Sequence, residues 1–226
     1  MDANVVNGKI YIIGGGRRGP QDNNFVINEV YDPTTDTWTT KTALPTGIED
    51  YTSAVVDNKI YIIGGAVEVA LNQIYDPETD TWSSGASLPT GLDQAATGVT
   101  TGASSKQEIY VIGGKQNLDA VNLNQVYAPE TDTWVTGSPM PTARFGLGVA
   151  VVNDSLFAIG GHEGWFGTSI SAANERYTPA EFIPEFPSPT PTPKTAPFPT
   201  TLVIVSVTIV VIVGLGILAY FKKRRS

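Results

Sequence analysis

Cysteine is absent from this chain of 226 residues, and histidine occurs only once, as His162. The absence of cysteine excludes disulfide bonds, thiolate metal sites and cysteine nucleophiles. With a single imidazole and no thiolate, the sequence predicts neither a metal site nor a cofactor. Basic residues are also few, 14 against 22 acidic ones. Because binding to phosphates needs a basic surface, we expect no nucleic-acid partner.

Charged residues are missing altogether from residues 202–221. A helix of about 20 apolar residues is roughly 30 Å long and spans the hydrocarbon layer of a bilayer. Four basic residues follow at once, Lys222–Arg225, and such a flank stays on the cytoplasmic side. The sequence therefore predicts a single transmembrane helix over 201–221 and a basic cytoplasmic tail over 222–226. The rest of the chain is then displayed outside the cell membrane.

Residues 183–200 precede this helix, and seven of these 18 residues are proline. Such a composition favours an extended polyproline II stalk over helix or sheet. Pro184, Glu185 and Phe186 resemble the Pro-Glu-Phe sorting signal of archaeal surface proteins, which implies surface display. In that family the tripeptide adjoins the membrane span, whereas here residues 187–201 intervene. We therefore interpret the region as a stalk and an anchor.

The remaining part, residues 1–182, repeats itself with a period of about 50 residues. Each period contains a Gly-Gly pair and then a tyrosine, and in three of them a tryptophan follows seven residues after the tyrosine. We interpret these residues as structural ones that join neighbouring units. They are Gly14, Gly15, Gly64, Gly65, Gly113, Gly114, Gly160 and Gly161, with Tyr31, Tyr75, Tyr127 and Tyr177 and with Trp38, Trp82 and Trp134.

Each period reads as four short strands, here named A to D. Strand A is a run of valine and alanine, and strand B follows after a tight turn and ends at the glycine pair. Strand C carries the tyrosine, and strand D carries the tryptophan after a turn that contains proline. The first period shows only a stub of strand A, residues 3–6, and the fourth lacks the tryptophan of strand D. Such four-stranded repeats are typical of propeller blades.

The glycine pair, the tyrosine and the tryptophan together resemble the kelch repeat, over residues 1–180. The resemblance implies an all-β fold made of kelch-type β-propeller blades. About four blades are present, whereas kelch rings have six or seven, so we expect an incomplete ring whose first and last blades each expose a face. We therefore predict that the chain self-associates to complete the ring or is joined by further blades.

Ligand binding is expected on the face formed by the B–C and D–A connections. The B–C loops are long and unlike one another, whereas the A–B and C–D turns are mostly minimal. Arginine suits carboxylates, and aromatic side chains suit sugars or peptide side chains. The candidate ligand-binding residues on this face are Arg17, Arg18, Glu49, Asp93, Arg144, His162, Trp165 and Phe166.

Arg144 has two possible roles. Aligning the blades through strand A places it level with Ile48 and Leu92, neither of which can donate a hydrogen bond from its side chain. The resemblance implies a ligand-contacting role for an arginine at this position. Arg144 is then a polar anchor for an anionic ligand, or else a structural cation that carboxylates neutralise.

The sequence predicts a membrane-anchored, surface-displayed binding module that recognises a protein or a carbohydrate, because it shows no paired nucleophile and base. Two alternatives remain open. The family it resembles includes sugar-modifying enzymes such as mutarotases and lyases, and a mutarotase needs only a carboxylate and an arginine, for which Glu49, Asp93 and Arg144 are available. Alternatively, the chain is a C-terminal fragment of a larger propeller whose site lies on other blades.

Overall fold

The computed structural model describes residues 2–15, 26–103, 105–164 and 169–180. The chain divides into two compact units, residues 1–182 and 183–226, and all described residues belong to the first. The predicted stalk, transmembrane helix and basic tail lie outside the described residues. In the part of the chain that is described, no helix is long and apolar enough to cross a membrane.

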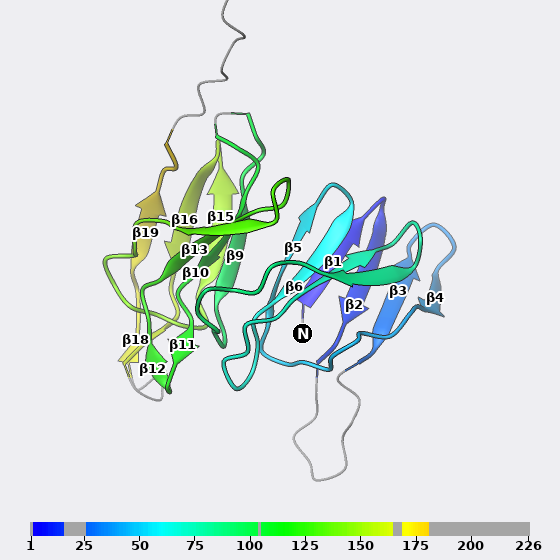
Figure 1. Ribbon diagram of the computed structural model, residues 1–226, viewed down its shortest axis with the longest axis horizontal. Coiled ribbons are helices and arrows are strands. Elements are labelled where there is room, and N and C mark those ends of the chain that lie inside the picture. The colour runs from blue at the N-terminus through cyan, green and yellow to red at the C-terminus, as the bar shows by residue number, and fades with distance from the viewer. Residues whose placement is uncertain (1, 16–25, 104, 165–168, 181–226) are drawn as a thin grey trace, which may run out of the picture. The chain divides into compact units, whose positions relative to one another are not determined.

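Four antiparallel sheets follow one another along the chain, one for each sequence repeat (Figure 1). Blade 1 consists of β1 (Asp2–Val6), β2 (Lys9–Ile13), β3 (Asn28–Asp32) and β4 (Thr37–Thr40), and blade 2 consists of β5 (Thr52–Val56), β6 (Lys59–Ile63), β7 (Asn72–Asp76) and β8 (Thr81–Ser84). Blade 3 consists of β9 (Ala96–Val99), β10 (Ile109–Ile112), β13 (Asn124–Ala128) and β14 (Thr133–Thr136), and blade 4 consists of β15 (Gly148–Val152), β16 (Ser155–Ile159) and β19 (Asn174–Tyr177). The predicted all-β architecture of about four blades is confirmed.

Strand B is apolar on both faces because a blade packs on each side of it. In β6, Ile60 and Ile62 face the cluster shared with blade 1, whereas Tyr61 and Ile63 face the cluster shared with blade 3. All four side chains are buried. The β-branched and aromatic residues suit a strand that is covered in this way. The hydrophobic core of the unit therefore lies between the blades.

The prediction of a stub for strand A of blade 1 is wrong. Strand β1 has five residues and pairs with β2 along its whole length, from Asp2 opposite Ile13 to Val6 opposite Lys9. Blade 2 holds it in place, because the hydroxyl of Ser53 donates hydrogen bonds to the side chains of Asp2 and Asn4. Blade 4 has three strands in its described residues, as the missing tryptophan predicted.

The A–B turns have the expected hairpin chemistry. Asp57 and Asn58 both have positive φ, at 50° and 60°, and so do Asn153 and Asp154, at 49° and 55°. These are the left-handed conformations that a two-residue type I′ turn requires. In blade 3 an insertion replaces the tight turn, and the carboxylate of Asp154 in blade 4 accepts hydrogen bonds from the backbone of the insertion.

The B–C connections of blades 3 and 4 form hairpins of their own, which the sequence did not predict. They are β11 (Lys115–Gln116) with β12 (Asp119–Ala120), and β17 (His162–Glu163) with β18 (Ser169–Ile170). In Figure 1 these hairpins lie along the lower side, opposite the A–B turns along the upper side. The antiparallel order thus places the two sets of connections on opposite faces, as expected.

Candidate functional site

The glycine pairs bring neighbouring blades into close contact on the B–C side. Each pair has positive φ, for example 67° at Gly64 and 132° at Gly65. A Cβ atom at Gly64 would lie 2.7 Å from the carbonyl oxygen of Leu92, and one at Gly161 would lie 2.7 Å from that of Phe145. Any larger residue would therefore push the next blade away. The structural role predicted for these glycines agrees with this geometry.

The D–A connections, which we call connectors, run over these glycines and form the inner edge of the B–C face. The backbone N–H groups of Gly15, Gly65 and Gly114 donate to the carbonyl groups of Ile48, Leu92 and Arg144, respectively. The sequence alignment placed these three connector residues at one level, and the hydrogen bonds confirm it. The glycine pairs thereby hold each connector at the same level along the blade that it crosses.

Two residues further on, the connectors bond to one another. Gln94 N donates to Asp50 O over 3.0 Å, and Gly146 N donates to Gln94 O over 2.9 Å. All three residues have positive φ, between 52° and 58°. The Gln94 amide also donates to the Asp50 carboxylate over 3.1 Å. We call this row, Asp50, Gln94 and Gly146, the mouth row.

Beside the mouth row lies a group of four side chains, Asp93, Lys115, Phe145 and His162, which we call the mouth cluster. Lys115 Nζ lies 3.2 Å from Asp93 Oδ2 and 5.0 Å from the centre of the Phe145 ring. The imidazole of His162 stacks on the Phe145 ring, with 5.5 Å between the ring centres. The cluster thus joins blades 3 and 4 through one ion pair, one cation–π contact and one stacked pair.

The backbone fixes the mouth cluster. Lys115 and Asp93 exchange two hydrogen bonds, of 2.7 and 3.2 Å, and His162 and Phe145 exchange two more, of 2.9 and 3.1 Å. Each pair forms an antiparallel bridge between a B–C hairpin and a connector. These side chains therefore start from rigid positions, although they belong to loops.

Two polar atoms of the mouth cluster are unsatisfied. Among the described residues, Asp93 Oδ1 and His162 Nδ1 are buried and have no hydrogen-bond partner. Burial raises the pKa of Asp93, the nearby Lys115 lowers it, and the negative charges of Asp50 and Glu68 raise it further. The site therefore has a spare acceptor in a locally negative field, which suits a group that donates hydrogen bonds and carries positive charge.

Arg144 contributes its backbone to this face but not its side chain, which is fully buried. Its guanidinium donates to the carbonyl groups of Gly160 and Ala158 and lies 2.8 Å from Glu175 Oε2. Partial burial raises the pKa of Glu175, but hydrogen bonds from Thr142 and Arg144 outweigh this and hold the pKa below its ordinary value. Of the two roles that the sequence left open for Arg144, the geometry favours the structural one.

Comparison with known proteins identifies the repeat. The Kelch motif family matches residues 2–45, 50–89 and 100–141. The chain belongs to the kelch family. The first two matched segments cover blades 1 and 2, the third covers blade 3 from β10 onward without β9, and blade 4 follows outside the match.

Several kelch proteins are similar over most of this chain. Kelch-like protein terF of Aspergillus terreus is 31% identical over 198 residues, which cover 80% of this chain and 40% of the relative. Human Kelch-like protein 15 is 25% identical over 188 residues, which cover 74% of this chain and 31% of the relative. The chain thus spans less than half the length of these relatives.

One similar solved structure is entitled "Structure of YjhT". It has a TM-score of 0.55 at 20% identity and covers 71% of this chain and 57% of that one. At this identity the similarity supports the fold alone.

The other predicted site residues of this kelch chain are scattered. The carbonyl of Glu49 accepts a hydrogen bond from Ala66 N, and its side chain is half-buried. Arg17, Arg18, Trp165 and Phe166 lie outside the described residues. The structure therefore brings together Asp93 and His162 from the predicted set.

Sequence reasoning missed Lys115 and Phe145. A signal was available for Lys115, because it directly follows the glycine pair of kelch blade 3, as His162 follows that of blade 4. Phe145 shares the alignment row of Glu49 and Asp93, where it replaces a carboxylate. The alignment of the blades thus placed Phe145 level with Asp93 without marking it as a site residue.

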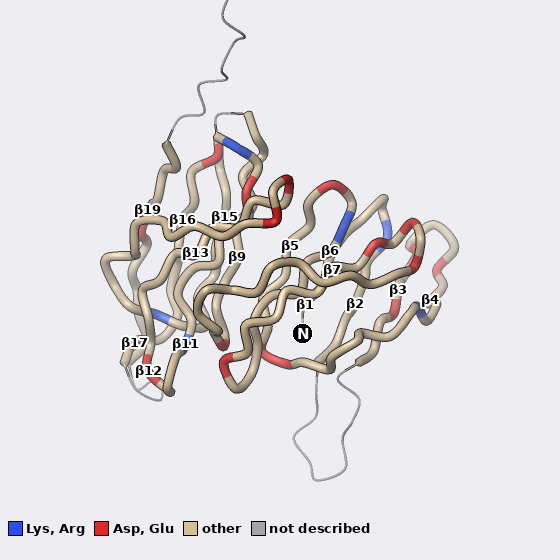
Figure 2. Tube along the Cα trace, in the orientation of Figure 1, with Lys and Arg blue, Asp and Glu red and all other residues tan. Residues whose placement is uncertain are grey.

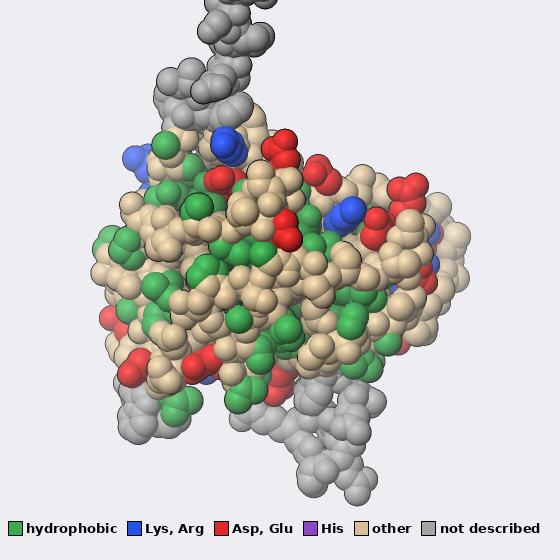
Figure 3. Space-filling view, in the orientation of Figure 1, with side chains coloured by type: hydrophobic (Ala, Val, Ile, Leu, Met, Phe, Trp, Pro, Cys, Tyr) green, Lys and Arg blue, Asp and Glu red, His purple; other side chains and the backbone are tan. Residues whose placement is uncertain are grey.

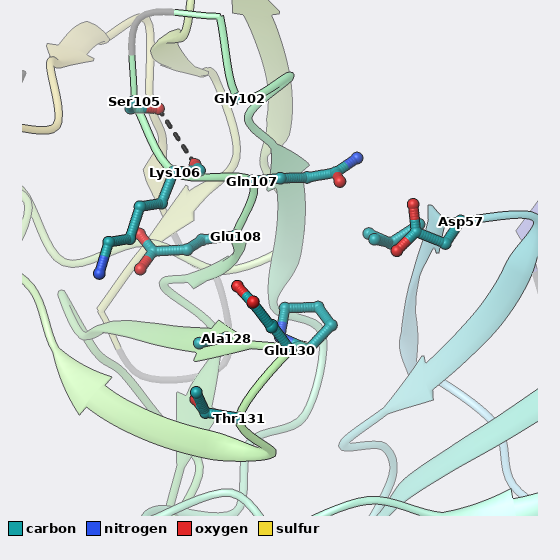
Figure 4. A pocket seen from close by; sticks show the side chains of 11 residues that line it. Asp57, Gly102, Ser105, Lys106, Gln107, Glu108, Ala128, Glu130 and Thr131 are labelled. Atoms are coloured by element: carbon teal, nitrogen blue, oxygen red, sulfur yellow. Dashed lines mark hydrogen bonds between the residues drawn. The ribbon is translucent and has the colours of Figure 1, made fainter. Parts of the chain in front are cut away.

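A pocket of about 370 Å³ lies on the opposite side, among the A–B turns of blades 2 and 3 and the C–D turn of blade 3 (Figure 4). Asp57 lines it from blade 2, and Glu108 and Glu130 line it from blade 3. In the described ranges, no three His, Cys, Asp or Glu residues form a group that could hold a metal ion. Figure 2 shows acidic residues on both sides of the unit, so acidity alone does not mark either face as the site.

Proposed function

We propose that this chain is a non-catalytic kelch binding module that holds a protein partner against its B–C loops and connectors. The mouth cluster is the observation that supports this proposal. Backbone bridges hold it rigidly, and Asp93 Oδ1 and His162 Nδ1 remain buried and unpaired among the described residues. The Asp93 side chain is 17% exposed, so its carboxylate remains within reach of a hydrogen-bond donor from a partner.

The charge around the site favours a partner with a positively charged side chain. The negative charges of Asp50 and Glu68 act on Asp93, and Lys115 is the cation that pairs with it, so three carboxylates stand against one ammonium group around Asp93. A protein is favoured over a carbohydrate, because the ring of Phe145 is buried and already contacts Lys115 and His162. It therefore offers no free face on which a sugar would stack.

Membrane anchoring is part of the proposal and is supported by the sequence. Residues 202–221 carry no charge and are followed by Lys222–Arg225. With this tail in the cytoplasm, the blades lie outside the cell. Protease added to intact cells is expected to remove the blades and to leave the anchor, whereas full protection of the blades would contradict this orientation.

The alternative of a sugar-modifying enzyme required a carboxylate together with an arginine at the mouth. The Arg144 side chain is buried and bonded to Glu175 and to backbone carbonyl groups. It is therefore held away from any ligand at the mouth, and we do not propose an enzymatic function.

A peptide array with basic, neutral and acidic members tests the proposed binding function on the full chain. Basic peptides are expected to bind best, and the affinity is expected to fall with added salt. Asp93→Asn should weaken binding by about tenfold, because it removes one charged acceptor. Binding should also fall with decreasing pH, beginning above the pH range in which an ordinary aspartate titrates, because the pKa of Asp93 is raised.

Glu130→Gln is the matched control, since Glu130 is exposed on the opposite face. It should leave the affinity unchanged. A preference for acidic or neutral peptides, or a loss in Glu130→Gln that Asp93→Asn does not show, would contradict the proposal.

A further inference from the structure

Blade 4 has an open edge in the described part of the chain. Strand β19 pairs with β16 on one side, and among the described residues no strand pairs with it on the other (Figure 1). In blades 1 to 3 that side carries strand D, which is β4, β8 or β14. An unpaired edge of this kind is a place where an extended segment can add as a further strand.

Strand D does more than complete its own blade, because it also binds the connector of the preceding blade. Trp82 Nε1 donates to Thr42 O over 2.9 Å, and Trp134 Nε1 donates to Ala86 O over 2.8 Å. Each tryptophan also packs on the tyrosine opposite it, with 4.9 Å between ring centres.

An aspartate two residues before each of these tryptophans completes the link. Asp80 Oδ1 accepts hydrogen bonds from Tyr75 in its own blade and from Thr42 N in the connector, over 2.6 and 2.9 Å. Asp132 Oδ1 accepts in the same way from Tyr127 and from Ala86 N, over 2.7 and 2.6 Å. The Asp-x-Trp segment therefore clamps one blade to the connector of the blade before it.

Blade 4 retains the receiving half of this clamp. Tyr177 packs on Tyr110 with 5.8 Å between ring centres, close to the 5.9 Å between Tyr127 and Tyr61 one blade earlier. Ser138 takes the place of Thr42 and Ala86, because Asn124 donates to its carbonyl just as the preceding asparagines donate to theirs. No described residue accepts a hydrogen bond from Ser138 N–H.

A pocket of about 330 Å³ opens where the missing tryptophan would lie. It is lined on blade 3 by Val126, Val135 and Gly137, and on blade 4 by Tyr177. Lys106 and Glu108 also line it, so the pocket carries one positive and one negative side chain, and the Glu108 carboxylate already accepts a hydrogen bond from the Tyr110 hydroxyl. Figure 3 shows apolar side chains spread over this face of the unit, on the blade 3 and blade 4 side as well as elsewhere.

The chain's own continuation does not provide this motif. In the register of the first three blades, Phe182 would stand at the position of the aspartate and Pro184 at that of the tryptophan. Phenylalanine supplies no carboxylate, and proline supplies neither an indole nor a backbone N–H for the strand ladder. An occupant with the Asp-x-Trp motif must therefore come from elsewhere.

We propose that blade 4 binds an extended segment of a partner chain with the sequence Asp-x-Trp, which adds to β19 as a fourth strand. The tryptophan packs on Tyr177 and donates to Ser138 O. The aspartate accepts from the Tyr177 hydroxyl and from Ser138 N–H. The surface lies on strand C and the outer pocket of blade 4, and it is separate from the mouth cluster.

A peptide taken from the chain itself tests this proposal. The capped peptide Thr-Asp-Thr-Trp-Val-Thr repeats residues 131–136, and its binding to the full chain in detergent is followed by fluorescence anisotropy. We expect saturable binding of one peptide per chain. Replacing the tryptophan of the peptide by alanine should abolish binding, and replacing its aspartate by asparagine should weaken binding by about tenfold.

Protein variants locate the site. Tyr177→Phe should weaken binding by about tenfold because it removes one hydrogen bond to the carboxylate. The matched change Tyr31→Phe should have no effect, since blade 1 already has its own Trp38 opposite Tyr31. The double variant Phe182→Asp/Pro184→Trp should fill the slot from within, abolish peptide binding and raise the melting temperature.

Three outcomes would overturn the proposal. One is binding of the alanine peptide with equal affinity, and another is an unchanged affinity in Tyr177→Phe. The third is a chain that sediments as a dimer that the peptide does not dissociate, since a second copy would then occupy the edge.

Discussion

Blades 1 and 3 carry the same tyrosine, aspartate and tryptophan, but among the described residues these side chains pack against a preceding blade only in blade 3. The local geometry is alike: the ring centres of Tyr31 and Trp38 lie 5.1 Å apart and those of Tyr127 and Trp134 lie 4.9 Å apart. Both tyrosines donate to their aspartate over 2.7 Å. The exposure differs at both positions: Trp38 is exposed and Trp134 half-buried, whereas Tyr31 is half-buried and Tyr127 buried.

The comparison separates two roles of one motif. Pairing of strands C and D within a blade sets the positions of the rings, and this happens with or without a neighbour. The connector of a preceding blade then covers the rings and uses the second acceptor site of the aspartate. The stabilisation that the motif provides should therefore depend on the interface and not on the motif itself.

The largest effect is expected from truncating the tyrosine in the two blades. Tyr127→Ala should lower the free energy of unfolding by about 3–5 kcal/mol, because it empties a buried site. Tyr31→Ala should lower it by about 1 kcal/mol or less, because Tyr31 is only partly covered. Urea denaturation of both variants measures the difference, and equal losses would show that the neighbouring blade contributes nothing.

A second prediction compares the interface of blades 2 and 3 with that of blades 3 and 4. Arg144→Ala should cost about 3 kcal/mol, since it removes the cation beside Glu175 and the hydrogen bonds to the carbonyl groups of Gly160 and Ala158. The double variant Arg144→Leu/Glu175→Gln introduces the residues found at the equivalent positions one blade earlier, Leu92 and Gln125. There the side-chain amide of Gln125 accepts a hydrogen bond from Thr90 N and donates one to Thr90 O. Denaturant unfolding should place this double variant within about 1 kcal/mol of the original chain. If the double variant were no more stable than Arg144→Ala, the two interfaces would not be interchangeable.

The smallest effect concerns acid stability. The backbone N–H of Ala86 and then the Tyr127 hydroxyl lower the pKa of Asp132 in the folded chain. This carboxylate therefore contributes stability above its unfolded pKa, and the contribution is lost as the pH falls through the folded pKa. Asp132→Asn should flatten this part of the profile of stability against pH. Asp36→Asn in blade 1 is the control and should cost less at neutral pH, because among the described residues Asp36 accepts only from Tyr31.

The blades could be predicted from the sequence because their signals are local and recur. The glycine pairs, the A–B turns and the level of Ile48, Leu92 and Arg144 all follow from aligning the repeats. Strand β1 could not be recognised at full length, because Asp2 and Asn4 do not form an apolar pattern and Ser53 of blade 2 holds them.

The candidate site was predicted only in part. Asp93 and His162 do lie in one cluster, but the ion pair with Lys115 depends on a hairpin, β11–β12, that no sequence signal indicated. The burial of Arg144 was equally hidden, because most of its acceptors are the backbone carbonyl groups of blade 4. A side chain that binds backbone carbonyl groups cannot be recognised from the sequence, because every residue type carries such a group.

The backbone hydrogen bonds of the mouth row run from each connector only to the next, from Asp50 to Gln94 and from Gln94 to Gly146. No described contact of this row skips a blade, so the cooperativity of the unit is that of a linear array with nearest-neighbour coupling. Opening then spreads inward from the ends. Amide hydrogens of β2 and β16 should exchange with solvent earlier than those of β6 and β10, which are covered on both faces.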